Sequence, residues 1–221
     1  MAILITGANG GLGNAVVEAF LASGATVYGA DRAWKNQPHS NPRFHAVEAN
    51  LLLPSECDRV AKNASPVDAL VHLVGGFGGG QPVAETTDET WDQMLSLNLR
   101  SAYSMFRAVL PAMLKAGMGR IVAVGSRAAL EPMANFAAYS VSKAALVALV
   151  KTVALEVKDS GVTANVILPS VIDTPANRAA MPSADASKWV KPESIAGLLV
   201  WLVSEAARDV SGVAIPIYGR A

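Results

Sequence analysis

Short apolar runs rich in β-branched residues alternate with longer helical patterns along the whole chain. Strands that are apolar on both faces and separated by helices imply a parallel sheet covered by helices on both sides. We therefore predict an α/β fold, a single doubly wound domain over 1–221 with a seven-stranded parallel sheet. The expected strands are 2–6, 25–30, 43–48, 68–74, 120–125, 162–168 and 213–217, and the expected helices are 11–23, 54–64, 88–116, 138–159 and 192–204.

Composition excludes several classes of partner. The 221 residues carry eighteen basic and eighteen acidic side chains, so the net charge gives no general attraction for nucleic acid or anionic membranes. Cys57 is the only cysteine, which excludes an intrachain disulfide and a CxxC metal site. Met1 leads almost directly into an apolar strand, and the longest apolar runs, such as 197–203, are too short to span a bilayer. We expect a cytoplasmic protein with no metal, no nucleic acid and no membrane partner.

The segment ILITGANGGLGNAV at 3–16 reads as a strand, a glycine-rich turn and a helix. Gly7, Gly11 and Gly13 lie where the backbone must turn tightly and admit a pyrophosphate close to the helix N-terminus. Asp31 follows at the end of the second strand, where a carboxylate can accept hydrogen bonds from both ribose hydroxyls of an adenosine. Together these features indicate a Rossmann-type dinucleotide site, although a glycine-rich turn without a ligand is the alternative.

The residues around Asp31 bear on the choice of cofactor. The 2′-phosphate of NADP would meet the Asp31 carboxylate as a like charge, which favours NAD(H). Arg32 keeps NADP(H) possible, because a guanidinium beside that position could pair with a phosphate. Gly10 offers no charge where a basic residue would have helped NADP.

Tyr139 and Lys143 are four residues apart on an expected helix, so their side chains share one face. A phenol is a poor acid–base catalyst near neutrality, and a neighbouring ammonium lowers its pKa towards a useful value. Ser126 ends the fifth expected strand and points to the same edge of the sheet, where its hydroxyl could hold a substrate oxygen. With the dinucleotide site, this trio predicts hydride transfer between a nicotinamide and a carbonyl or alcohol carbon. The alternative is a Tyr and a Lys that extend to solvent.

With these motifs, the chain resembles the short-chain dehydrogenase/reductase family over essentially its whole length. The family pattern TGxxxGxG appears as TGANGGLG at 6–13, and YxxxK appears as YSVSK at 139–143, with the family serine at Ser126. The pattern PGx(V/I)xT corresponds to PSVIDT at 169–174, and the family's helix asparagine corresponds to Asn98.

The resemblance implies site residues beyond those argued from spacing. Asn98 would shape a water relay to Lys143, and Lys143 would also bond the nicotinamide ribose, while the Ile172 backbone and Thr174 would hold the carboxamide. The full set of expected cofactor contacts is Gly7, Asn9, Gly11, Leu12, Gly13, Asp31, Arg32, Asn50, Leu51, Val74, Gly75, Tyr139, Lys143, Pro169, Ile172 and Thr174.

Some positions depart from the family pattern. HLVG at 72–75 replaces the usual NNAG, and we interpret His72 as a packed core histidine rather than a catalytic one. Asn50 stands where the family often has an acidic residue, and Ser170 replaces the glycine of PG. The segment 173–191 takes the position of the substrate lid.

Within the lid, Met181, Trp189 and Arg178 are the expected contact residues. The lid and the segment 74–79 also resemble quinonoid dihydropteridine reductases, although these relatives generally lack the serine that Ser126 provides. Arg127 and Arg178 could attract a carboxylate-bearing substrate, or could be ordinary solvated surface.

Three functions remain open at this stage. The first is an NAD(P)(H)-dependent oxidoreductase acting on a small carbonyl or alcohol substrate. The second is a dihydropteridine-type reductase that uses the same site, and the third is a non-catalytic regulator that senses dinucleotides. The apolar helices expected at 88–116 and 138–159 favour a homodimer or homotetramer, because such faces must be buried somewhere.

Overall fold

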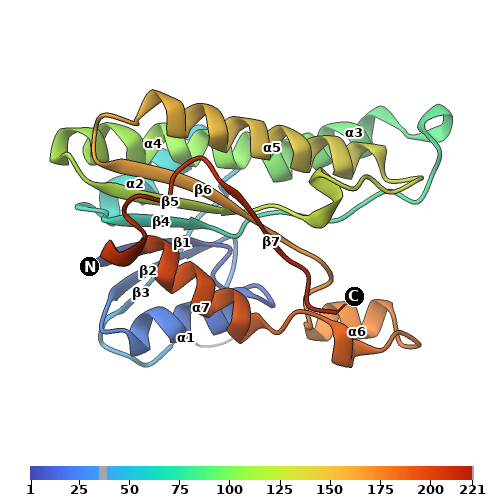
Figure 1. The fold of residues 1–221 in the computed structure, drawn as a ribbon, viewed down its shortest axis with the longest axis horizontal. Helices are drawn as coiled ribbons and strands as arrows, with labels where there is room; N and C mark the ends of the chain where they lie inside the picture. Colours follow the sequence, from blue (N-terminus) through green and yellow to red (C-terminus); the bar gives the residue numbers. More distant parts are fainter. Residues whose placement is uncertain (35–38, 221) are drawn as a thin grey trace.

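The computed structural model describes residues 1–34 and 39–220, which form one twisted sheet between two layers of helices (Figure 1). The strand order is β3-β2-β1-β4-β5-β6-β7, and every pairing of neighbours is parallel. This confirms the predicted doubly wound, seven-stranded parallel sheet. The strands are β1 (Ala2–Thr6), β2 (Thr26–Asp31), β3 (Phe44–Glu48), β4 (Ala69–His72), β5 (Gly119–Val124), β6 (Val162–Pro169) and β7 (Ala214–Ile217).

The helices divide between the two faces of the sheet (Figure 1). Helices α1 (Gly13–Ala22) and α7 (Pro192–Val203) cover one face, and α2 (Pro54–Asn63), α4 (Ser101–Ala116) and α5 (Ala137–Glu156) cover the other. Strand β1 shows why both faces need a cover, since Ile3 and Ile5 enter one apolar cluster and Leu4 enters the other, all with no exposed surface.

The single helix expected over 88–116 is divided in the structure. Helix α3 (Asp88–Leu95) runs into a π-helical turn, η2 (Ser96–Arg100), before α4 begins. In this π-helical turn Asn98 points inward, and its side chain accepts from the N–H of Gly76 and donates to the Gly76 carbonyl oxygen. Sequence periodicity could not predict this turn, because its cause is a contact with a distant loop.

Smaller differences concern the ends of strands. Strand β4 ends at His72 rather than 74, and β5 ends at Val124, so Ser126 follows the strand instead of closing it. The lid contains a short helix, α6 (Pro175–Ala180), and the remaining short elements are 3₁₀ turns. These turns are η1 (Val83–Glu85), η3 (Arg127–Ala129), η4 (Ala186–Lys188) and η5 (Glu205–Ala207).

Helix α5 qualifies the expectation that no apolar segment is long enough to span a bilayer. It is, among the described residues, the one helix whose length and hydropathy would suffice for a membrane crossing. Half of that apolar stretch is buried inside the protein, where Leu146 and Val150 pack against the sheet. The composition of α5 is thus that of a core helix.

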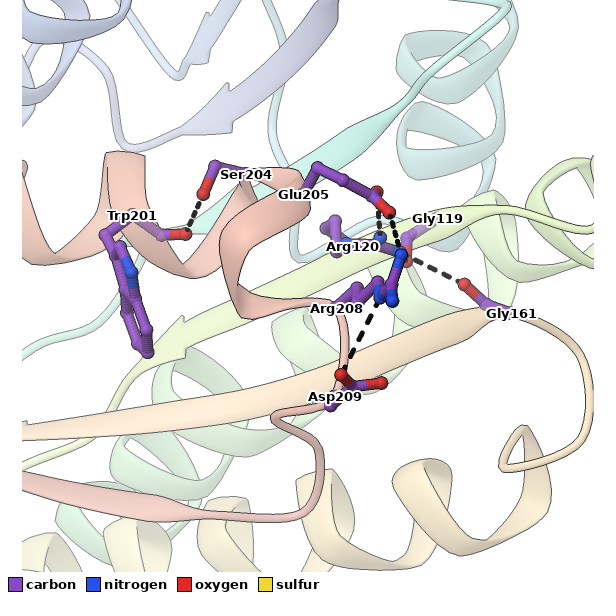
Figure 2. Close-up of polar contacts among 8 residues, drawn as sticks. All are labelled: Gly119, Arg120, Gly161, Trp201, Ser204, Glu205, Arg208 and Asp209. Carbon is purple, nitrogen blue, oxygen red and sulfur yellow. Dashed lines mark hydrogen bonds and ion pairs between the residues drawn. The ribbon is translucent and has the colours of Figure 1, made fainter.

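At the N-terminal edge of the sheet, a buried arginine joins β5, the turn before β6 and the 3₁₀ turn η5 (Figure 2). Arg120 is only 6% exposed, and its Nη1 donates to the carbonyl oxygens of Gly119, at 2.9 Å, and Gly161, at 3.0 Å. Its Nη2 reaches the Glu205 carboxylate at 3.4 Å, and Glu205 also pairs with Arg208. The Arg120 guanidinium thus ties the start of β5 to the turn before β6 and to Glu205, although its Nε has no hydrogen-bond partner among the described residues.

Candidate active site

The first turn is shaped for a phosphate group. Gly7 has a φ of 74°, and a Cβ at Gly13 would lie 2.4 Å from the carbonyl oxygens of both Gly7 and Ala8. Only glycine fits such positions. Leu12 caps α1 without a side-chain hydrogen bond, so the first N–H groups of that helix have no side-chain acceptor. These donors and the helix dipole fit the pyrophosphate of a dinucleotide.

The Asp31 carboxylate lies at the end of β2 beside this turn. It accepts the N–H of Asn9 at 2.9 Å and the N–H of Arg32 at 2.7 Å. The Asn9 side chain in turn donates to the carbonyl oxygen of Ala33 at 2.8 Å. Asp31 therefore holds the loop that follows it and the glycine turn in one arrangement, and remains partly exposed for a ribose.

Thr174 brings the distant end of the site against the first turn. A Cβ at Gly11 would lie 3.1 Å from the Thr174 side chain, although the two residues are far apart in sequence. Thr174 is 8% exposed and caps α6 by accepting the N–H of Asn177, whose amide donates to the Ile172 carbonyl at 2.8 Å. These contacts hold Ile172 and Thr174 just after Pro169 closes β6, beside the glycine turn.

The other expected cofactor residues lie on the neighbouring strand ends. Val74 and Gly75 follow β4, and Leu51 is buried after β3. Asn50 is exposed, and its side-chain oxygen accepts the N–H of Leu52, so this oxygen already has one local partner. The Asn50 amide group keeps its donors, and its oxygen keeps one further acceptor site for adenine.

Ser126 and Tyr139 come together at the same edge, and their side chains are hydrogen-bonded. Burial raises the pKa of the Tyr139 phenol, and the bond with Ser126 opposes this rise in part. Ser126 also accepts the N–H of Ala128, which fixes its hydroxyl at the start of η3. The two side chains thus lie together at this edge, and their catalytic roles stay a prediction.

Lys143 differs from what the sequence predicts. Its Nζ donates to the carbonyl oxygen of Val124 at 3.1 Å, and burial lowers its own pKa to about 8. The expectation that Lys143 lowers the pKa of Tyr139 is not met in this structure, because burial of the phenol dominates and raises that pKa. A side chain on the same helical face need not direct its charged end at its neighbour.

Gly75 allows Lys143 and Asn98 to approach one point. A Cβ on Gly75 would lie 3.0 Å from Lys143 Nζ and 2.8 Å from Asn98 Oδ1. Asn98 is fully buried, and its Nδ2 also donates to Ser142 Oγ at 3.0 Å. Ser142 donates to the Tyr139 carbonyl oxygen at 2.7 Å, so it ties Asn98 to the catalytic helix. Sequence reasoning missed Ser142, although it lies three residues after Tyr139 within YSVSK.

His72 is the packed core histidine that the sequence indicates. It is 1% exposed, and burial, with the charge of Lys143 as a second cause, lowers its pKa to about 3. Its Nε2 lies 3.3 Å from Ser101 Oγ, whose only hydrogen goes to the Leu97 carbonyl oxygen at 2.6 Å. Nε2 must therefore carry the ring hydrogen, and Nδ1 accepts from Thr6 Oγ1 at 2.9 Å. This chain links β1 to the π-helical turn.

The expected lid contacts are only partly met. Arg178 pairs with the Asp173 carboxylate through two nitrogens, at 2.5 and 2.9 Å, and Lys191 binds the same carboxylate. These hydrogen bonds hold the pKa of Asp173 far below its usual range. Trp189 is 6% exposed and belongs to the core, whereas Met181 remains exposed at the surface. Arg178 and Trp189 thus fix the lid instead of presenting free groups.

Within 1–34 and 39–220, no group of three or more histidine, cysteine or acidic side chains is arranged to hold a metal ion. The donors at this edge are N–H groups, hydroxyls and an ammonium; the Asp31 carboxylate accepts backbone N–H groups, and that of Asp173 is engaged by Arg178 and Lys191. Such a set fits an anionic dinucleotide rather than a cation.

Comparison with known proteins agrees with this geometry. The family model for short chain dehydrogenase matches residues 1–185. Short chain dehydrogenase prhI of Penicillium brasilianum is 30% identical to this chain over 244 residues, which cover 97% of this chain and 94% of the relative.

Two solved structures are similar over almost the whole chain. An oxidoreductase of the short chain dehydrogenase/reductase family from Burkholderia thailandensis has a TM-score of 0.89 at 31% identity and covers 98% of this chain and 90% of its own. The 3-ketoacyl-(acyl-carrier-protein) reductase from Brucella melitensis, complexed with NADH, has a TM-score of 0.88 at 26% identity and covers 98% and 96%.

Proposed function

Because this chain belongs to the short-chain dehydrogenase/reductase family, an enzyme family of oxidoreductases acting on CH–OH or C=O groups, we propose that Ser126, Tyr139 and Lys143 catalyse hydride transfer between NAD(H) and a small carbonyl or alcohol substrate. The observation that carries this proposal is the hydrogen-bonded pair of Ser126 and Tyr139, with the buried Lys143 ammonium one helical turn away.

Each residue has a distinct role in the proposed reduction. The bound nicotinamide supplies the hydride. Ser126 donates its hydroxyl hydrogen to the substrate oxygen and orients the carbonyl, and Tyr139 gives its phenolic proton to the same oxygen as charge develops there. Lys143 stabilises the resulting phenolate once ligand binding draws its remaining donors towards the site. Oxidation of an alcohol uses the same groups in reverse.

Asn98 is proposed as a positioning residue. Its bonds to both backbone groups of Gly76 fix the loop after β4, and its Oδ1 lies close to the space that Gly75 leaves open beside Lys143. A water held there would connect Lys143 with the interior, as the family resemblance implies.

For the cofactor, we propose NAD(H) in preference to NADP(H). The Asp31 carboxylate is partly exposed at the ribose position, and its hydrogen bonds to the Asn9 and Arg32 N–H groups keep it there. It would bond the ribose hydroxyls of NADH and repel a 2′-phosphate. Arg32 is exposed and could offset part of that repulsion.

The first experiment is a fluorescence titration of the protein with NADH and NADPH, followed by a panel of ketones, aldehydes and a quinonoid dihydropterin. We expect NADH to bind more tightly and at least one panel member to be reduced. Asp31→Ala should weaken NADH binding about 10-fold or more and change NADPH binding less than about 3-fold. Asp31→Asn is the matched control, because it keeps the acceptor oxygen without the charge. Equal losses for both nucleotides would remove the argument for NAD(H).

The second experiment separates catalysis from binding. Tyr139→Phe should lower kcat by about 10³-fold and leave the affinity for NADH within about 2-fold, because it removes only the proton donor. Undiminished turnover would exclude Tyr139 as the acid. A protein that binds NADH tightly yet turns over no panel member would instead favour the non-catalytic regulator.

We also propose that the protein is a homo-oligomer that associates through α4 and α5. Both helices expose apolar side chains on the outer side of the layer, among them Tyr103, Leu114, Val141 and Leu155. Light scattering at micromolar concentration should give a mass of two or four chains, and a monomer would refute the proposal.

A further inference from the structure

An exposed aromatic ring lies next to the proposed acid. Phe77 is 64% exposed, in the loop after β4, and its ring centroid lies 4.9 Å from that of Tyr139 at an interplanar angle of 76°. On another side it stacks on Phe136, again at 4.9 Å, with the planes 26° apart. Phe77 and Phe136, which we call the aromatic platform, thus border the phenol that gives up its proton.

Close packing between two loops holds the platform in place. A Cβ on Gly79 would lie 2.7 Å from the Phe136 ring and 3.0 Å from the Asn135 carbonyl oxygen, so the loops touch too closely for any side chain. The N–H of Gly80 donates to the same oxygen at 2.7 Å, and Asn135 itself has a φ of 67°. These contacts fix the glycine-rich loop. They therefore hold Phe77 in an exposed position, and its exposure does not come from loose packing.

The charged side chains beside the site are engaged with one another. Arg127 pairs with Glu131 and lies over the Tyr218 ring, and Arg178 pairs with Asp173. The rings beside Phe77 are those of Phe136 and Tyr139, and both guanidiniums already have a carboxylate partner, so neither needs an anionic group on the ligand.

We infer that the substrate is an uncharged carbonyl or alcohol compound whose reacting carbon carries a planar, conjugated ring, and that the ring packs on Phe77. This inference rests on the proposed function, because the substrate oxygen must lie at Tyr139 and Ser126. A substrate ring one bond from the reacting carbon would lie near the Phe77 ring, within the roughly 4.5–7 Å between centroids at which aromatic pairs pack. Phe77 is a specificity-determining residue here and takes no part in proton transfer. The heterocycle of a dihydropterin is also planar and conjugated, but its reacting atoms lie within the ring, so it falls outside this description.

The test uses two ketones that differ only in the ring, acetophenone and cyclohexyl methyl ketone. Their intrinsic reactivities differ, so the measured quantity is a ratio, the kcat/KM for acetophenone divided by that for cyclohexyl methyl ketone. The ratio in each variant is compared with the ratio in the unmodified protein. Phe77→Leu keeps apolar bulk and removes the ring, and should lower the ratio about 3- to 10-fold. Phe77→Tyr keeps an aromatic ring and should leave the ratio within 2-fold of that in the unmodified protein. Trp201→Leu, which removes an exposed ring on α7 next to Ser204 and the Arg120 contacts (Figure 2), should leave the ratio unchanged.

A ratio that stays within 2-fold in Phe77→Leu would overturn the inference while the proposed function stands. 4-Acetylbenzoate tests the charge, and faster turnover of it than of acetophenone would also overturn the inference.

If neither ketone is reduced, ligand-observed NMR on the NADH-saturated protein gives the answer without turnover. Acetophenone binding that weakens at least 3-fold in Phe77→Leu would support the platform although the proposed reaction had failed. Binding that is absent, or equal in both proteins, would overturn the platform itself.

Discussion

Two buried cations at opposite ends of β5 show how differently one sheet can hold a positive charge. Arg120, at the start of the strand, is 6% exposed, and Lys143, which bonds the carbonyl of Val124 at its end, is 5% exposed. Arg120 donates to two carbonyl oxygens and a carboxylate, whereas the described residues give Lys143 a single acceptor, at 3.1 Å.

The difference follows from the chemistry of the two groups. A guanidinium is planar and permanently charged, so it can bridge several fixed acceptors, as Figure 2 shows for Arg120. An ammonium is a compact charge whose pKa moves readily on burial, and that of Lys143 falls to about 8. The Arg120 guanidinium bonds fixed acceptors through both Nη atoms and leaves only its Nε without one among the described residues, whereas the Lys143 ammonium keeps further donors in reserve.

Replacing Lys143 is expected to produce the largest effect, and mainly on the reaction. Lys143→Met should lower kcat/KM by about 10³-fold, because it removes the ammonium proposed to stabilise the phenolate of Tyr139. Thermal unfolding should show a melting temperature that is unchanged or higher, since a buried charge with one acceptor has been replaced by an apolar chain. Activity within 10-fold of the unmodified protein would contradict the role given to Lys143.

The pH dependence of stability should report the same lysine. Its pKa is about 8 in the folded protein and 10.5 in a model compound, so above pH 8 the unfolded chain binds a proton that the folded one has lost. The free energy of unfolding should therefore rise with pH, by about 2 kcal/mol between pH 7 and 9.5. Below pH 8 both states carry the proton and this contribution disappears.

Urea denaturation at several pH values checks this expectation as the difference between the unmodified protein and Lys143→Met. The upper limit of pH 9.5 keeps the measurement below the titration of Tyr139, whose raised pKa acts with the opposite sign. Two parallel curves would mean that Lys143 keeps an ordinary pKa in the folded state.

Replacing Arg120 is expected to show the reverse pattern, with a smaller effect. Arg120→Met should cost about 1.5 kcal/mol of unfolding free energy, because buried carbonyl oxygens lose a donor, and should leave kcat/KM within 2-fold. Glu205→Gln is the matched control. Its side chain is 71% exposed, so loss of the ion pair should cost less than about 0.5 kcal/mol in urea denaturation. A large loss of activity in Arg120→Met would break the contrast between the two edges.

Much of the fold could be predicted from alternation of strands and helices. Strand β1 has the predicted bounds, and the sheet has the predicted class and direction, because these depend on local patterns of apolar residues. The meeting of Ser126 with Tyr139 was also within reach, since the C-terminal ends of parallel strands share one edge of the sheet.

The errors arise where a distant contact decides the outcome. The π-helical turn at Asn98 depends on Gly76, and the direction of Lys143 depends on the Val124 carbonyl, which helical spacing does not describe. Arg178 pairs with Asp173, five residues earlier, and Trp189 is buried in the core. The assignment of individual roles, the preference for NAD(H) and the oligomeric state remain predictions.

The π-helical turn also bears on how this chain can change in length. An α-helix advances about 100° per residue, and the wide turn over Ser96–Arg100 holds one residue more than an α-helical turn needs. Deleting one residue there would rotate α3 by about 100° against α4 and carry Asn98 away from Gly76. The number of residues between α3 and α4 is therefore fixed by the contact of Asn98 with Gly76.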